Sequence, residues 1–169
     1  ESKRELKKAL MQQMLTGKLR FPGFGKPAIL DEIPEGWHTE IFKDTFKLVK
    51  RKNSKGMKRV LTASGEYGLI EQIEFFNKSV AGKDLSGYYL LKQGEFAYNR
   101  SAMNGYPYGA IKRLDRYEEG VLSTLYICFA LKKEVKANSD FYAYYFEAGR
   151  LNRQLRMITQ IGGRAHGLL

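Results

Sequence analysis

Cysteine and histidine are scarce in this 169-residue chain. The single cysteine, Cys128, cannot form a disulfide within the chain, and its place in an apolar run indicates a core residue. The two histidines, His38 and His166, leave too few ligands for a usual structural zinc site, which takes a tetrahedral set of Cys and His side chains. Stability is therefore expected from apolar packing, and 43% hydrophobic residues are typical of a folded domain of this length.

Long apolar runs are also missing. No stretch approaches the ~20 consecutive apolar residues that a membrane-spanning helix needs, and no signal peptide is visible. We therefore expect a cytoplasmic protein without a membrane partner. The sequence begins at Glu1 rather than Met and ends at Leu169 after a glycine-rich phrase, which favours a fragment of a longer polypeptide.

The motifs of several enzyme classes are absent as well. The chain has no GxGxxG, no P-loop GxxxxGK[ST] and no HExxH, which argues against a methyltransferase, an ATPase and a zinc protease. Glu134 and Lys136 have a nuclease-like spacing, but no Pro-Asp pair precedes them, and no Ser, His and Asp set stands out. We expect a non-catalytic chain without a metal site or cofactor of its own.

Positive charge, in contrast, is abundant. The chain has 29 Lys and Arg against 18 Asp and Glu, a formal net charge of +11 and a pI near 9.7, which favours a polyanionic partner. One basic segment, residues 47–59, contains no acid, and no acid follows Glu147. A solvated surface explains such runs as well as a phosphate contact does. The candidates for phosphate contact are Lys50, Arg51, Lys52, Lys55, Lys58, Arg59, Lys112, Arg113, Arg150, Arg153, Arg164 and His166.

Residues 90–131 hold the second group of candidates. Two apolar, strand-like runs flank a loop that mixes amides, cations and aromatic rings with Gly105, Pro107 and Gly109. Asn and Arg side chains make paired hydrogen bonds to base edges. Together with the turn at residues 64–68, this loop supplies the base-reading candidates, which are Tyr67, Asn99, Arg100, Ser101, Asn104 and Tyr106.

Local patterns predict the organisation of the chain. Residues 2–15 are predicted to be a helix whose stripe of Leu6, Leu10 and Met14 packs on this chain or on a partner helix. Residues 18–33 are rich in Pro and Gly and are predicted to be a linker. We therefore expect a helix segment (1–17), a linker (18–33) and one domain (34–169).

The body of the chain is predicted to be α+β. Residues 60–63, 90–98 and the apolar run 121–131 indicate strands, and residues 64–68 a turn. Asn138 or Ser139 is expected to cap a helix that Gly149 interrupts. Strands followed by helices favour a small mixed or antiparallel sheet with C-terminal helices.

Five phrases, in order, resemble the specificity subunits of type I restriction-modification systems. They cover almost the whole chain and are KKALMQQMLTGKLRF (7–21), IPEGWHTEIFKDTF (33–46), KSVAGKDLSGYYLLKQGEFAYNRS (78–101), NGYPYGAIKRLDRYEEGVLSTLYICFAL (104–131) and FYAYYFEAGRLNRQLRMITQIGGRAHGLL (141–169). The first resembles the end of a spacer helix, and the others resemble a target recognition domain. The resemblance implies the second recognition domain of such a subunit, with a half-barrel-like sheet, preceded by the end of a coiled-coil spacer helix.

The same resemblance implies a function. Each recognition domain of the family reads one half of a split site in double-stranded DNA. The subunit positions adenine methyltransferase (modification) subunits and restriction (translocase) subunits, and S-adenosylmethionine, ATP and Mg are expected in those partners. Base-contacting residues vary within the family, so the resemblance assigns none of them here.

Three other interpretations remain open at this level. The chain is alternatively a protein-interaction module with incidental DNA contact, or an RNA-binding domain whose aromatic side chains stack on unpaired bases. A third possibility is a recognition domain fused to a methyltransferase in one longer chain.

Overall fold

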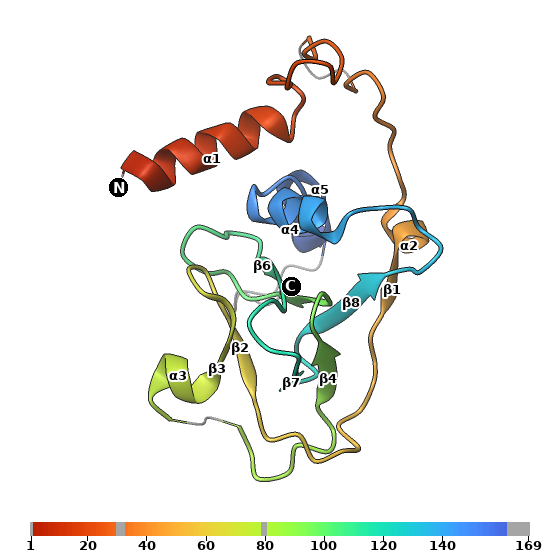
Figure 1. Cartoon of the computed structure of the whole chain (residues 1–169). Coiled ribbons are helices and arrows are strands. Elements are labelled where there is room, and N and C mark those ends of the chain that lie inside the picture. Colours follow the sequence, from red (N-terminus) through yellow and green to blue (C-terminus); the bar gives the residue numbers. More distant parts are fainter. Residues whose placement is uncertain (1, 30–32, 79–80, 162–169) are drawn as a thin grey trace. The chain divides into compact units, whose positions relative to one another are not determined.

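A computed structural model describes residues 2–29, 33–78 and 81–161 (Figure 1). The chain divides into two compact units, residues 1–42 and 43–169, which are described separately. Within the described ranges, no helix combines the length and the apolar character needed to cross a bilayer.

The first unit consists of a helix and a folded-back segment. The helix α1 (Ser2–Met14) confirms the helix predicted from the apolar spacing. On its predicted contact stripe, Leu6 and Leu10 are 61% and 41% exposed, so packing on a partner helix stays a prediction. The segment that follows is not extended: the Ala28 amide donates to the Gly17 carbonyl over 2.9 Å. Residues 17–37, including the predicted linker, therefore belong to this first unit.

The second unit contains short strands and helices. The helix α2 (Phe42–Thr45) lies at the division between the units. The further elements are β1 (Phe46–Leu48), β2 (Leu61–Ser64), β3 (Gly68–Glu71), α3 (Gln72–Phe76), β4 (Tyr89–Lys92), β5 (Phe96–Asn99), β6 (Ala110–Arg113), β7 (Glu119–Leu122), β8 (Ile127–Leu131), α4 (Ser139–Glu147) and α5 (Asn152–Ile161).

All ladders of the second unit are antiparallel. One sheet has the strand order β1-β8-β5-β6, and two smaller ladders pair β2 with β3 and β4 with β7. Among the described residues these ladders form no closed barrel. The structure thus confirms a mixed α+β fold with antiparallel sheets and few helices.

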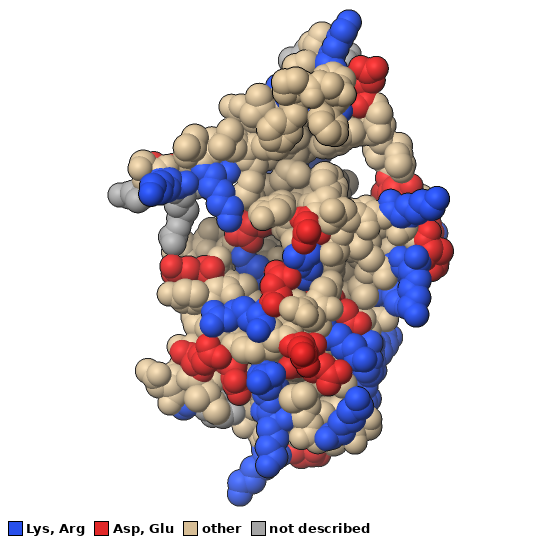
Figure 2. Space-filling model, in the orientation of Figure 1, with Lys and Arg blue, Asp and Glu red and all other residues tan. Residues whose placement is uncertain are grey.

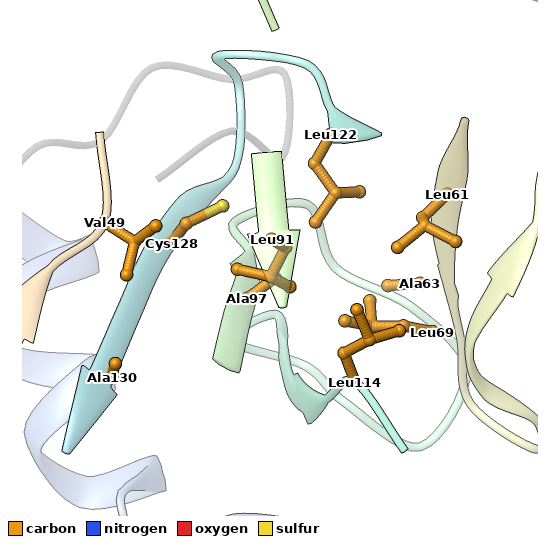
Figure 3. Packing of buried hydrophobic residues seen from close by; sticks show 10 residues of the cluster. All are labelled: Val49, Leu61, Ala63, Leu69, Leu91, Ala97, Leu114, Leu122, Cys128 and Ala130. Atoms are coloured by element: carbon orange, nitrogen blue, oxygen red, sulfur yellow. The ribbon is translucent and has the colours of Figure 1, made fainter. Parts of the chain in front are cut away.

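The four-stranded sheet separates two apolar layers, because neighbouring residues of a strand point to opposite faces. On one face, Phe96 and Phe129 stack with ring centroids 5.4 Å apart, and Phe146 of α4 packs edge-on against both. On the other face, Ala97 and Cys128 meet the side chains of the smaller ladders (Figure 3). Helix α4 therefore covers one face of the sheet, and the β2–β3 and β4–β7 ladders cover the other.

Two expectations about the strands need correction. The run 121–131 is two strands, β7 and β8, separated by a turn in which the Tyr126 amide donates to the Ser123 carbonyl. The region after Asn99 is not all loop, since β6 pairs with β5 along its whole length. The C-terminal expectation is confirmed: Asn138 caps α4 through the Asp140 amide (2.7 Å), and Gly149 separates α4 from α5.

Candidate nucleic-acid interface

Two turns of the second unit meet and form what we call the paired-loop site, the turn 64–68 between β2 and β3 and the loop 99–109 between β5 and β6. In the turn, the Ser64 hydroxyl accepts from the amides of Glu66 and Tyr67, each over 3.2 Å. In the loop, Met103 and Tyr106 exchange backbone hydrogen bonds of 3.1 and 2.8 Å. Asn104 and Gly105 therefore form the exposed tip of a tight turn.

The turn and the loop are in direct contact at Gly65. A Cβ atom added to Gly65 would lie 3.2 Å from Cε2 of Tyr106 and 3.7 Å from the carbonyl oxygen of Asn104. The carbonyl oxygen of Gly65 also lies 3.3 Å from the Tyr106 hydroxyl. The tip of the loop therefore lies beside the turn that carries Tyr67.

An ion pair between a buried lysine and a half-buried glutamate adjoins this contact. The ammonium group of Lys112, on β6, donates to the Tyr106 hydroxyl (2.7 Å), to Oε2 of Glu147 on α4 (2.5 Å) and to the Gly65 carbonyl (3.3 Å). The Tyr106 hydroxyl in turn donates to Oε1 of Glu147 over 2.7 Å. Burial, followed by the nearby carboxylate of Glu147, raises the pKa of Tyr106, so its hydroxyl remains a donor. The turn, the loop, the sheet and α4 are thus joined at one point.

The base of the loop is fixed by side chains as well. The hydroxyl of Tyr98 donates to the Tyr108 carbonyl over 2.6 Å, and burial raises the pKa of Tyr98 to about 12. The Asn99 carboxamide oxygen accepts from the Ser101 amide over 3.1 Å. Gly109 has a φ of 83°, and a Cβ there would lie 2.3 Å from the Asn99 carbonyl oxygen, so the chain can cross at this point only with glycine. The loop therefore has little conformational freedom at its two ends.

The six base-reading candidates differ in how far their side chains are already engaged. Arg100 is half-buried, and its Nε donates to the Leu125 carbonyl over 3.3 Å. Asn99 and Tyr106 are engaged as described above, and Ser101 is half-buried. Tyr67 is 51% exposed and Asn104 is exposed, and neither side chain has a hydrogen-bond partner within the described part of the chain. Tyr67 and Asn104 are therefore the candidates whose side chains are presented to solvent.

Among the phosphate candidates, Arg51 and Lys52 already have internal partners. The Arg51 guanidinium makes two hydrogen bonds to the Glu95 carboxylate, of 3.0 and 3.2 Å, and a third to the Leu90 carbonyl over 3.0 Å. The Lys52 ammonium donates to the Gly87 carbonyl over 2.7 Å. Both residues are nonetheless exposed, so a phosphate contact by either stays a prediction.

Three further candidates are less exposed than Arg51 and Lys52 and also have partners within the chain, namely Arg59, Arg113 and Lys112. Arg59 lies 3.6 Å from the Glu71 carboxylate and 4.7 Å over the ring of Tyr117. Arg113 pairs with Asp140 at 2.7 Å and also with Asp115. Lys112 is 7% exposed, and its three donors point at the three acceptors described above. The position of Lys112 therefore gives no support to the phosphate contact that its charge suggested.

The remaining phosphate candidates point outward or lie outside the described residues. Arg164 and His166 belong to the latter group. Five are exposed and form no ion pair within the part of the chain that the structure describes, namely Lys50, Lys55, Lys58, Arg150 and Arg153. The contact of these five with phosphate stays a prediction, and it is consistent with their exposure.

Two residues of the site escaped the sequence reasoning. Glu147 sits in an amphipathic helix, where an acid ordinarily faces solvent, and Gly65 is one glycine of a short turn. No local pattern reports that either contacts Lys112, because they are separated from it by 35 and 47 residues.

Within the described residues, no cluster of three or more His, Cys, Asp or Glu side chains is placed to hold a metal ion. No protein-family model matches the chain, and no curated protein matches it either. The family resemblance therefore depends on the sequence phrases alone.

Proposed function

We propose that residues 43–169 recognise one half of a bipartite site in double-stranded DNA, as the target recognition domain of a type I restriction-modification specificity subunit. In this proposal the chain performs no chemistry. It positions adenine methyltransferase and restriction subunits, which carry S-adenosylmethionine, ATP and Mg. The helix α1 is the end of a spacer helix, and the antiparallel ladders correspond to the half-barrel-like sheet of the family.

The observation that carries the proposal is the paired-loop site. It presents an amide, Asn104, and an aromatic ring, Tyr67, on two turns that are held against each other. An Asn side chain makes two hydrogen bonds to adenine in the major groove. A fixed backbone matters for such readout, because a hydrogen bond to a base edge depends on placement within about 0.5 Å.

The charges of the chain support the proposal in a more limited way. Figure 2 shows Lys and Arg mixed with Asp and Glu on the face it presents, so the net charge of +11 does not form one uninterrupted positive field there. Internal pairing engages Arg51, Arg59, Lys112 and Arg113. The cations best placed for phosphate are therefore the five exposed ones that form no ion pair within the described residues, namely Lys50, Lys55, Lys58, Arg150 and Arg153.

Duplex binding by the complete specificity subunit, assembled with its methyltransferase, tests the proposal. The target is first found by selection from a pool of duplexes with a randomised window. Asn104→Ala should then cost about 1–3 kcal/mol on the selected duplex and relax the choice at one base pair. Equal weakening on every duplex would remove Asn104 from the readers. No selection at all by the wild-type assembly would refute the proposed function.

The phosphate role is tested by the salt dependence of binding. Lys55→Ala should weaken binding to every duplex alike and reduce the slope of log K against log salt by about one unit. Glu118→Ala offers a control in an exposed position outside the paired-loop site, and it should leave the slope unchanged. An unchanged slope in Lys55→Ala would take Lys55 out of the phosphate set.

Protein interaction is the second candidate, and the short helix α3 favours it. Its side chains Ile73, Phe75 and Phe76 are 57%, 41% and 42% exposed, and exposed apolar groups are common at protein interfaces. Co-purification with a methyltransferase subunit, combined with an absence of sequence-selective duplex binding, would favour this candidate over DNA recognition. Competition by single-stranded RNA would instead favour an RNA-binding domain.

A further inference from the structure

Burying the ammonium group of Lys112 in its ion pair with Glu147 carries a desolvation cost. A lysine that is 7% exposed has lost most of its hydration, and only well-placed acceptors offset that loss. Its ammonium group finds three acceptors, one each from Tyr106, Glu147 and Gly65, and these come from three different segments. An ammonium group has three donors, so none is left for a phosphate.

Lys112 of this ion pair contacts both turns of the paired-loop site. The Lys112 ammonium lies 4.4 Å from the centre of the Tyr106 ring and holds the Gly65 carbonyl of the neighbouring turn. Tyr106 directly follows the tip of the loop, and Gly65 lies two residues before Tyr67. The ammonium group therefore links the segment that carries Asn104 to the segment that carries Tyr67.

We propose that Lys112 and Glu147 are positioning residues that set the sequence preference of the paired-loop site without touching DNA. This inference rests on the proposed function, since it assigns a role within the same site. The pair fixes the separation between the two presented side chains, and hence which base edges the two reach together. Removing the pair should therefore change which duplex is preferred, while contacts to phosphate stay as they are.

A double variant, Lys112→Met with Glu147→Gln, tests the inference, because it removes the pair without leaving an isolated buried charge. The complete subunit with its methyltransferase is measured on the duplex selected by the wild type and on its single-base-pair variants. All measurements are made well below the melting temperature of each variant. We expect affinity for the selected duplex to fall about tenfold or more, with unchanged affinity for unrelated duplexes and an unchanged salt slope.

Two control variants separate positioning from stability. Asp140→Ala breaks the link between Arg113 and Asp140, which joins the same strand β6 to the other end of α4. Val121→Ala opens a space among fully buried side chains of β7. Both should lower the melting temperature and leave the ratio of affinities for selected and unrelated duplexes unchanged.

The outcomes are distinct. If the wild type selects a duplex and the double variant selects it equally well, or if the controls lose selectivity to the same degree, the positioning role is wrong and the proposed function stands. If the wild type selects no duplex, both the function and the positioning role fall. A selective loss confined to the double variant supports both.

Discussion

The basic segment (47–59) and the loop 99–109 are both rich in polar side chains, but different parts of the chain hold them in place. Backbone hydrogen bonds to neighbouring strands hold the basic segment, as between Arg51 and Leu90 (2.7 Å) and between Arg59 and Val121 (2.8 Å). Side-chain bonds of Arg51, Lys52 and Asn53 add to them. Side chains, above all those of Tyr98 and Tyr106, hold the loop. Lys50, Lys55 and Lys58 are exposed and form no ion pair among the described residues, so we expect them to tolerate substitution, whereas changes in the loop reach the core.

The largest difference is expected from Glu147→Leu compared with Lys55→Met. The first leaves the buried Lys112 without its carboxylate, and breaking a buried pair typically costs 3–5 kcal/mol. Because the Glu147 side chain is 36% exposed, we expect about 2–4 kcal/mol, measured by urea denaturation. Lys55→Met should stay within about 0.5 kcal/mol. Similar losses of unfolding free energy in the two variants would contradict the expected difference between the loop and the basic segment.

A smaller effect is expected from the hydroxyl of Tyr106. Tyr106→Phe keeps the ring and removes one hydrogen bond to each of Lys112 and Glu147, which should cost about 1.5 kcal/mol of unfolding free energy. Tyr67→Phe is the matched change in the neighbouring turn, and its hydroxyl has no partner among the described residues. A neutral Tyr106→Phe would mean that the loop is held without this hydroxyl.

Arg51 tests whether the basic segment depends on any of its cations. Arg51→Ala removes the two hydrogen bonds to Glu95 and the one to the Leu90 carbonyl, and it should cost about 1 kcal/mol, since the arginine side chain is 40% exposed. Lys50→Ala, one residue earlier, is the control and should be neutral within about 0.5 kcal/mol. Equal costs would show that pairing with Glu95 contributes nothing measurable.

The last prediction concerns the dependence of stability on alkaline pH. The pKa of Tyr98 is raised from about 10 in the unfolded chain to about 12 in the folded chain by burial. Between these values the unfolded state has lost the proton and the folded state keeps it, so stability falls as pH rises, by at most about 1.4 kcal/mol per pH unit. Tyr98→Phe should make this decline shallower in urea denaturation series from pH 9 to 12, and an equally steep decline would contradict the assignment.

Sequence patterns identified the elements whose signals are local. Apolar spacing predicts the helix α1. A glycine within an apolar periodic segment predicts the break at Gly149, which has a φ of 69° in the structure. Strand β6 was missed because Lys112 and Arg113 resemble loop residues, and only pairing with β5 makes the segment a strand. The run 121–131 was read as one strand because its turn, 123–126, contains neither Gly nor Pro.

In the candidate site, too, sequence patterns do not predict contacts between residues that lie far apart along the chain. Sequence reasoning placed Tyr67 and Asn104 in turns, and the structure brings these turns together through Gly65. It also assigned Lys112 to phosphate from its charge alone. Whether a cation faces solvent depends on a partner far away along the chain, in this instance Glu147, and no spacing rule reports such a partner.

The triple contact of the Lys112 ammonium has a consequence for engineering. A graft of residues 99–109 into another scaffold would arrive without the glycine, lysine and glutamate that support it, because these lie at positions 65, 112 and 147. The smallest transferable module is thus discontinuous, and a chimera has to exchange all of these stretches together to inherit the donor's behaviour.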